Sequence, residues 1–394
     1  MKTAIVIGGG IAGCSTAYAL AKRGISVTLI ERHEKLAQEA SGNQIGVLYP
    51  KFGIKQDAAS LLALQGFQFT LKLLNELSSK EKIFDACGLI QLAFNAREQC
   101  RLEALANSPA LKFINIAEAS EIAGIQLKTG GLYLPQAGWL KPAVLCEVLS
   151  TLPLITKKMM VNALKIEKCS STWRVLDDKN NAFEADIAVI CNANDIKQFN
   201  QCQSAAITSV RGQLNLFKQT KESLNIKTVI CSDHYLSPSV EGWHCIGTTY
   251  APNDMNPTAR DADTRENLNA LRAITPEIYQ HIDMDSLHSR VAWRSQTRDY
   301  LPLAGQLIDE TAIRDNPPRY NANPSDLPWL EDLYVNSGHG SKGMITAPIC
   351  GELIACLATN DDLSIEPKLA SKLNPSRFLL RELGLKQLAN SLYN

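Results

Sequence analysis

The chain has 394 residues, of which 45% are hydrophobic and 20% charged, so it has the composition of a globular protein with two domains and not of a disordered one. Forty basic residues balance forty acidic ones, which excludes a global field that attracts nucleic acid or anionic membranes and leaves open a local basic patch. Eleven cysteines without CxxC or Cys/His spacing argue against a disulfide framework and a metal site, and for a reducing compartment, by default the cytoplasm.

The first predicted elements lie between Ala4 and Glu31, which read as strand, glycine-rich turn, helix and second strand. Gly8 allows a tight turn, Gly10 lets the backbone approach a pyrophosphate, and Gly13 lets helix and strand pack closely. The pyrophosphate would lie at the helix N-terminus, and Glu31 would accept a hydrogen bond from a ribose hydroxyl. The alternative is an ordinary βαβ unit without a ligand. The apolar run behind Met1 is explained by this unit better than by a secretory signal. The sequence contains no run of 18 consecutive apolar residues, so it predicts no membrane-spanning helix.

The middle of the chain alternates between helical and strand patterns. A turn-rich loop is expected from Glu39 to Pro50 and a helix from Ala58 to Leu77. Strands are expected at Leu89–Phe94 and Leu132–Leu134, followed by a helix from Lys141 to Leu152 with a proline in its first turn.

Later segments return to the first sheet. Met159–Ile166 and Thr172–Leu176 read as a hairpin, whereas Ile187–Cys191 reads as a strand buried on both faces. Leu333–Asn336 is a further strand, followed by a glycine-rich turn and a helix. The intervening segment, Ala205–Asp326, is expected to form the other domain.

Several motifs resemble the glycine oxidase and D-amino-acid oxidase superfamily of FAD-dependent enzymes. They are the glycine-rich start, Arg211-Gly212-Gln213, Tyr235-Leu236-Ser237-Pro238, the segment around Arg294 and the GHGSKG turn. This resemblance implies an α/β fold in which a Rossmann-like FAD-binding domain is interleaved with a mixed-sheet substrate domain. The expected FAD domain comprises residues 1–50, 137–200 and 329–394, and the expected substrate domain comprises 51–136 and 201–328.

A closer resemblance is to the oxidoreductase domain of the MnmC family of bifunctional tRNA-modifying proteins. It is seen in Ala40–Phe52, Ala137–Leu149, Cys245–Tyr250, Thr297–Pro302, Gly340–Ala355 and Leu373–Phe378. The resemblance implies removal of the carboxymethyl group from 5-carboxymethylaminomethyl-(2-thio)uridine at the tRNA wobble position. Since no residues precede the glycine-rich start where a methyltransferase domain would lie, we expect methylation by another polypeptide or none.

The implied substrate is a secondary amine with a glycine-like end. Hydride transfer from the glycine carbon to the flavin leaves an imine, which water splits into an aminomethyl uridine and glyoxylate. An apolar pocket lowers the pKa of the amine by desolvation, so no dedicated base is required.

The carboxylate of this substrate calls for an arginine, which forms two parallel charge-assisted hydrogen bonds. The resemblance assigns that role to Arg294, with Tyr235 supporting the same carboxylate. The alternatives are a surface ion pair for Arg294 and simple packing for Tyr235. Arg211 is a second pocket cation or a structural ion pair, and we favour the structural one.

The turn from Gly338 to Gly343 matches the family's turn beside the flavin ring, where the next helix N-terminus stabilises reduced flavin. Lys342 is a candidate for stabilising reduced flavin or superoxide, or is a solvated loop lysine. His339 is interpreted as a loop contact. Lys51 is a weaker candidate for the flavin face or for tRNA phosphate. Asn194 replaces a glycine that many members of the family have, and asparagine tolerates positive φ.

The resulting candidates are three catalytic residues and a set of cofactor-binding residues. The catalytic candidates are Arg294, Tyr235 and Lys342. The FAD-binding candidates are Gly8, Gly10, Ile11, Ala12, Gly13, Glu31, Arg32, Ser41, Asn43, Gly46, Val161, Asn192, Gly338, Gly340, Ser341, Lys342, Gly343 and Met344.

Three functions stay open at this point. The favoured one is a tRNA-directed FAD oxidase. The second is a small-molecule oxidase of glycine, sarcosine or a D-amino acid, and the third is a flavin-carrying binding protein without turnover, which would not need Arg294.

Overall fold

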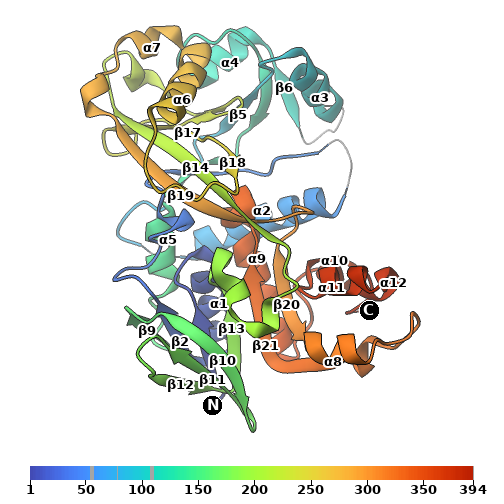
Figure 1. Cartoon of the computed structure of the whole chain (residues 1–394). Helices are drawn as coiled ribbons and strands as arrows, with labels where there is room; N and C mark the ends of the chain where they lie inside the picture. Colours follow the sequence, from blue (N-terminus) through green and yellow to red (C-terminus); the bar gives the residue numbers. More distant parts are fainter. Residues whose placement is uncertain (54–56, 78, 107–110, 394) are drawn as a thin grey trace.

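The computed structural model describes residues 1–53, 57–77, 79–106 and 111–393. A six-stranded sheet with α1 and α9 against it occupies the lower part of Figure 1. Its order is β20-β21-β13-β1-β2-β9, with β20 antiparallel and the other strands parallel. The bounds are β1 Thr3–Ile7, β2 Ser26–Glu31, β9 Ile155–Met159, β13 Ile187–Ile190, β20 Leu303–Ile308 and β21 Trp329–Ser337. Every residue of β13 is apolar and buried, as expected for a central strand covered on both faces.

A nine-stranded mixed sheet occupies the upper part of Figure 1, beside α4, α6 and α7. Its order is β18-β14-β17-β16-β15-β5-β7-β6, and β19 pairs with the other edge of β14. The bounds are β5 Leu89–Leu92, β6 Lys112–Ile114, β7 Gly131–Leu134, β14 Ile207–Lys218, β15 Val229–Cys231, β16 Tyr235–Leu236, β17 Trp243–Gly247, β18 Ala251–Pro252 and β19 His288–Thr297.

Two small sheets and the helices complete the fold. One small sheet joins β3 Gly46–Leu48, β8 Gly138–Leu140 and β4 Phe84–Asp85, and the other joins β10 Ala163–Cys169, β11 Thr172–Asp177 and β12 Ala182–Ala185. The helices are α1 Ile11–Lys22, α2 Ala58–Glu76, α3 Ala96–Ala106, α4 Ile116–Ala123, α5 Pro142–Leu149, α6 Asp261–Ile274, α7 Pro276–Gln280, α8 Glu310–Asp315, α9 Gly343–Thr359, α10 Pro367–Leu373, α11 Arg377–Glu382 and α12 Lys386–Ala389.

Helix α9 is the central helix of the lower part. It packs against α1 and α2, and apolar residues surround it because it is hydrophobic on all sides. Together with the turn before it, Gly340–Thr359 is long and apolar enough to cross a membrane by length and composition. With 67% of its most apolar 18-residue window buried inside the protein, it has the character of a core helix.

The predicted fold class is confirmed, but three segments differ from the predictions. Met159 does not begin the hairpin: it ends β9, a lysine-containing edge strand parallel to β2, and the hairpin is β10 with β11. The predicted loop from Glu39 to Pro50 contains β3. Strand β20, inside the segment expected to form the other domain, pairs with β21 of the six-stranded sheet. The exact domain boundaries remain a prediction.

Candidate active site

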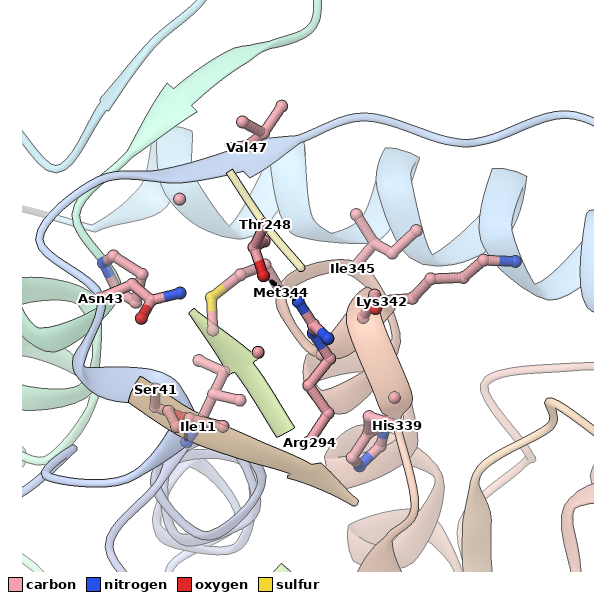
Figure 2. A pocket seen from close by; sticks show the side chains of 18 of the residues that line it. Ile11, Ser41, Asn43, Val47, Thr248, Arg294, His339, Lys342, Met344 and Ile345 are labelled. Carbon is pink, nitrogen blue, oxygen red and sulfur yellow. Dashed lines mark hydrogen bonds between the residues drawn. The ribbon is translucent and has the colours of Figure 1, made fainter. Parts of the chain in front are cut away.

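A cavity of about 470 Å³ lies where the carboxyl ends of β1, β13 and β21 meet the face of the large sheet. In open parallel sheets, ligands bind at this edge because the strand-to-helix turns meet there. Figure 2 shows side chains that converge on the cavity from the turn after β1, the turn after β21, α9 and the large sheet. Of the predicted site residues, the cavity is lined by Arg294, Tyr235, Lys342, Gly10, Ile11, Ala12, Ser41, Asn43, Gly46, Gly338, Gly340, Ser341, Gly343 and Met344.

The first glycine turn, from Gly8 to Gly13, leaves space for a ligand at the start of α1. A Cβ on Gly13 would lie 1.8 Å from the carbonyl oxygen of Gly8, so only glycine allows helix and strand to pack this closely. Gly8 has φ +106° and lies against Cys191. Around Gly10, by contrast, an added Cβ would meet only Ser41. The N–H of Ile11 donates to Ser41 Oγ at 3.0 Å, which fixes Ser41 at the helix N-terminus.

Glu31 lies beneath this turn, at the end of β2. Its two oxygens accept hydrogen bonds from the N–H groups of Gly9, at 2.6 Å, and His33, at 2.9 Å. A carboxylate has further acceptor sites, so these bonds orient Glu31 without exhausting it. Glu31 is buried and does not line the cavity.

Five other predicted cofactor residues also lie outside the cavity lining. Gly8 and Gly13 shape the turn from behind, and Arg32 forms ion pairs with Glu39 and Asp195. Val161 donates its N–H to the carbonyl of Glu31. The Oδ1 atom of Asn192 is buried, and among the described residues it has no hydrogen-bond partner.

The backbone after β13 differs from the prediction made for Asn194. The residue with positive φ is Ala193, at 53°, so Asn194 does not use the positive φ that asparagine tolerates. Ala193 lines the cavity, and Asn194, like Asn192, has a buried Oδ1 without a partner in the described part of the chain. The open space at Gly10, which lines the cavity at the start of α1, fits the pyrophosphate of a bound dinucleotide. The unpaired oxygens of Asn192 and Asn194 lie outside the cavity lining.

Hydrogen bonds of the His339 ring fix the second glycine turn, from Gly338 to Gly343. Its Nε2 lies 2.9 Å from Asn336 Oδ1 and its Nδ1 lies 2.9 Å from Thr346 Oγ1. Since the amide of Asn336 donates to Thr16, its Oδ1 accepts, and we assign the ring proton to Nε2. Burial lowers the pKa of His339 to about 3, so the ring is neutral and serves as the predicted loop contact.

Arg294 reaches the cavity from β19. Its Nη2 donates to Thr248 Oγ1 at 2.5 Å, and its Nη1 donates to the carbonyl of Thr249 at 3.3 Å. Within residues 1–53, 57–77, 79–106 and 111–393, no acidic side chain forms an ion pair with it. Burial lowers its pKa, although Tyr235 and Tyr250 oppose this effect. A desolvated guanidinium without a counter-ion is a binding site for an anion.

Tyr235 also lines the cavity, beside Arg294. Its hydroxyl donates to the carbonyl of Ile45 at 3.2 Å and lies 3.3 Å from Cys245 Sγ. Burial raises the pKa of this phenol well above its usual value, so it stays protonated. In this arrangement the phenol supports the strand β3 side of the cavity.

Lys342 extends away from Arg294 in Figure 2. Burial lowers the pKa of its ammonium group, Asp57 raises it and Lys51 lowers it further. Lys51 lines the same cavity. Lys342 and Lys51 therefore make one end of the cavity positively charged, and Arg294 does not belong to that end.

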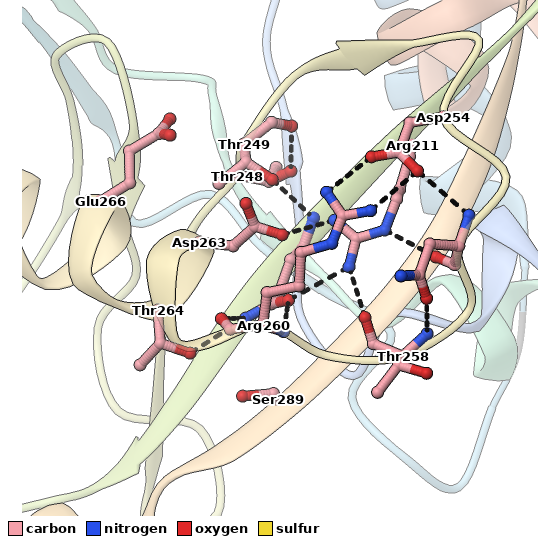
Figure 3. Close-up of polar contacts among 12 residues, drawn as sticks. Arg211, Thr248, Thr249, Asp254, Thr258, Arg260, Asp263, Thr264, Glu266 and Ser289 are labelled. Carbon is pink, nitrogen blue, oxygen red and sulfur yellow. Dashed lines mark hydrogen bonds and ion pairs between the residues drawn. The ribbon is translucent and has the colours of Figure 1, made fainter.

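Successive side chains of β14 point to opposite faces of the sheet, and this places Arg211 and Arg294, the two arginines of the sequence motifs, on different faces. Gly212 lies on the cavity side of the sheet together with Arg294, because Arg294 pairs with Val210 and residues two apart on a strand share a face. Arg211 therefore points to the opposite face, where it forms an ion pair with Asp263 and donates to the carbonyls of Asn256 and Thr258 (Figure 3). This is the structural ion pair favoured from the sequence.

The lining residues that were not predicted as site residues include Gly212, Thr248 and Tyr250. A Cβ on Gly212 would lie 2.7 Å from Arg294 Nη2, so this glycine makes the space for the guanidinium. All three lie within motifs that carried the family resemblance, and the alternation of β14 was the signal that could have singled out Gly212.

Comparisons with known proteins agree with this geometry. The profile of the FAD dependent oxidoreductase family, DAO, matches residues 3–357. The tRNA 5-methylaminomethyl-2-thiouridine biosynthesis bifunctional protein MnmC of Methylobacillus flagellatus is 39% identical over 99% of the chain, and that of Pseudomonas fluorescens is 37% identical over 97%. The chain spans only 61% and 60% of these relatives' lengths.

Solved structures share the fold. Glycine oxidase from Geobacillus kaustophilus is similar with a TM-score of 0.77 and 20% identity, covering 94% of this chain and 98% of its own. Iminodiacetate oxidase from Chelativorans sp. BNC1 is similar with a TM-score of 0.74 and 17% identity, covering 92% and 97%.

Proposed function

The chain belongs to the FAD dependent oxidoreductase (DAO) family, and from this premise we propose that its substrate is a wobble nucleoside of tRNA. The reaction oxidises the secondary amine of 5-carboxymethylaminomethyl-(2-thio)uridine, releases glyoxylate and leaves 5-aminomethyl-(2-thio)uridine. The proposal is supported by relatives of up to 39% identity whose names give them a role in tRNA 5-methylaminomethyl-2-thiouridine biosynthesis.

The observation that carries the proposal is the half-buried guanidinium of Arg294 in the cavity, which has no acidic partner among the described residues. A substrate that ends in a glycine-like carboxylate supplies the missing negative charge. Thr248 and Thr249 fix the guanidinium from one side, and Gly212 leaves it space. The donors that these contacts leave free are available to the carboxylate.

FAD, when bound, supplies the oxidant for the C–H bond next to the substrate amine. The glycine turn at Gly10, with Ser41, would hold its pyrophosphate, and the turn at Gly338–Met344 would lie near its ring. Glu31 would accept from its ribose. A substrate bound in the cavity would lose part of the water around its amine, and this desolvation favours the neutral amine needed for oxidation.

A second candidate, a small-molecule amine oxidase, is favoured by the same arginine, because glycine and sarcosine also end in a carboxylate. A third, a flavin-carrying binding protein without turnover, has no use for an unpaired Arg294. The finer predictions follow the first proposal: the protein acts in the cytoplasm, and a separate methyltransferase uses the aminomethyl product.

The experiment is to incubate the purified, flavin-loaded protein with tRNA that carries the carboxymethylaminomethyl group and to analyse the nucleosides by mass spectrometry. We expect conversion to the aminomethyl nucleoside with an equal amount of glyoxylate. Unchanged nucleosides, together with rapid oxidation of sarcosine, would establish the small-molecule alternative. Bound flavin that no amine reduces would establish the third.

A further inference from the structure

An exposed aromatic ring stands at the rim of the cavity and has no role in the function described so far. Tyr250 lines the cavity, yet 50% of the residue is exposed. Tyrosine usually buries most of its ring, because the ring is the apolar part of the side chain. Tyr250 thus offers an aromatic surface to whatever enters the cavity.

The ring of Tyr250 is fixed at both ends. Its backbone directly precedes β18, which pairs with one edge of β14, whereas its hydroxyl accepts a hydrogen bond at 2.7 Å from Nε2 of Gln296 on β19, which pairs with the other edge. The side chain therefore crosses β14. Gln296 and Arg294 are two positions apart on β19 and share a face, so the ring lies on the cavity side with Arg294.

A ring held in this way is a prepared stacking surface. Because its hydroxyl is already bound, little side-chain freedom remains to be lost when a flat group packs against it. Every nucleobase presents such a flat face, and stacking on an aromatic side chain contributes about 1–3 kcal/mol per base. A free amino acid such as glycine or sarcosine has nothing to place there.

We propose that Tyr250 is a specificity-determining residue that stacks on the pyrimidine ring of the substrate while Arg294 binds its carboxylate. This inference rests on the proposed function. The two side chains then recognise the two ends of one molecule, and the oxidisable amine lies between them. A base would have to leave the anticodon stack to reach this position, as in other enzymes that act on bases.

The test compares wild-type protein with Tyr250→Leu and Tyr250→Phe, using two substrates: tRNA carrying the carboxymethylaminomethyl group, and sarcosine. Reduction of the bound flavin is followed by stopped-flow absorbance at varied substrate concentration. We expect Tyr250→Leu to raise the half-saturating tRNA concentration about 5- to 150-fold, the fold-change that corresponds to one stacked base. The Phe variant keeps the ring and should remain within a few-fold of wild type.

Sarcosine provides the matched control. Its half-saturating concentration should be unchanged in both variants, because sarcosine has no base to place against Tyr250. An equal loss for sarcosine and tRNA would mean that Tyr250 only supports the local fold, and an unchanged value for tRNA in the Leu variant would mean that no base stacks there; either result overturns the inference. Wild-type protein that is reduced by sarcosine but not by the tRNA would instead overturn the proposed function.

Discussion

Arg294 is the residue on which the proposed chemistry depends most. The protein half-buries its guanidinium without supplying an acidic partner among the residues described, and such an arrangement is costly unless a ligand anion completes it. Arginine matches a carboxylate in geometry as well as in charge, which lysine does not.

We therefore predict that Arg294→Gln loses about 2–5 kcal/mol of substrate interaction, a fall of at least about 30-fold in kcat/KM. Flavin content, read from the absorbance spectrum, should stay at the wild-type level because Arg294 lies outside the glycine turns. Arg314→Gln is the matched control, since Arg314 forms an exposed ion pair with Glu382 and should be neutral. A wild-type rate of flavin reduction in Arg294→Gln would remove Arg294 from the site.

His339 gives a prediction for pH dependence. Burial holds the pKa of its ring at about 3, below the ordinary 6.5, so folding favours the neutral form. This contribution to stability is fully present above about pH 6.5 and is lost as the pH falls toward 3, at up to about 1.4 kcal/mol per pH unit.

The measurement is the free energy of unfolding in urea between pH 7 and pH 4.5. It should fall more steeply with decreasing pH in wild type than in His339→Gln. The control variant His281→Gln changes an exposed histidine, and its free energy of unfolding should depend on pH as in wild type. Equal slopes in wild type and His339→Gln would show that His339 is not buried as a neutral ring.

At the scale of elements, the start of α1 separates cofactor binding from folding. Gly13 is required by the contact of α1 with the end of β1, because an added Cβ would overlap the Gly8 carbonyl. Gly10 has no such contact with the protein backbone.

Two glycine variants follow from this difference. Gly13→Ala should destabilise the protein by about 1–3 kcal/mol and also lose FAD. Gly10→Ala should keep the wild-type midpoint of thermal unfolding for the flavin-free protein, and yet bind FAD at least about tenfold more weakly, because the methyl group occupies the approach of the pyrophosphate. Fluorescence titration with FAD measures the second effect, and normal FAD affinity in Gly10→Ala would show that the cofactor does not approach this turn.

A second prediction concerns the loop between β19 and β20, which α11 holds through Asp299. Burial alone would raise the pKa of Asp299, but hydrogen bonds and charge from Arg377 and Arg381 outweigh it and lower the pKa from 3.8 to about 2. The difference corresponds to about 2 kcal/mol of stability that is present above about pH 4 and lost as the pH falls through 2.

Asp299→Asn should therefore lower the free energy of unfolding at pH 7 by at least about 2 kcal/mol. The gap between variant and wild type should narrow below pH 4, as wild type becomes protonated. Urea titrations at pH 7 and pH 3 measure it. A gap that is the same at both pH values would contradict a role for the charge of Asp299.

Much of this element structure was predictable because hydrophobic periodicity and glycine spacing are local signals. β1, α1, α2 and β13 agree with the predictions for that reason. β9 and β20 were missed or misplaced because they are edge strands, whose membership in a sheet is decided by long-range pairing. Likewise Ala193, shortly after β13, has a positive φ that no residue preference indicates.

At the scale of the whole molecule, the chain leaves the six-stranded sheet and returns to it several times, and this interleaving brings the candidate site together. Gly10, Arg294 and Lys342 come from distant parts of the sequence, and yet they line one cavity. Family resemblance predicted their proximity. The sequence pattern alone did not reveal that Thr248 and Tyr250 complete the cavity, because loop residues show no periodicity.

The most direct test of the central claim compares the two substrate classes on the same protein. Flavin reduction is measured under anaerobic conditions with tRNA bearing the carboxymethylaminomethyl group and with sarcosine. If the cavity holds the carboxylate of a base-linked amine, kcat/KM for the tRNA should exceed that for sarcosine by at least about fivefold, the least that one stacked base contributes. Equal values, or faster reduction by sarcosine, would contradict the account.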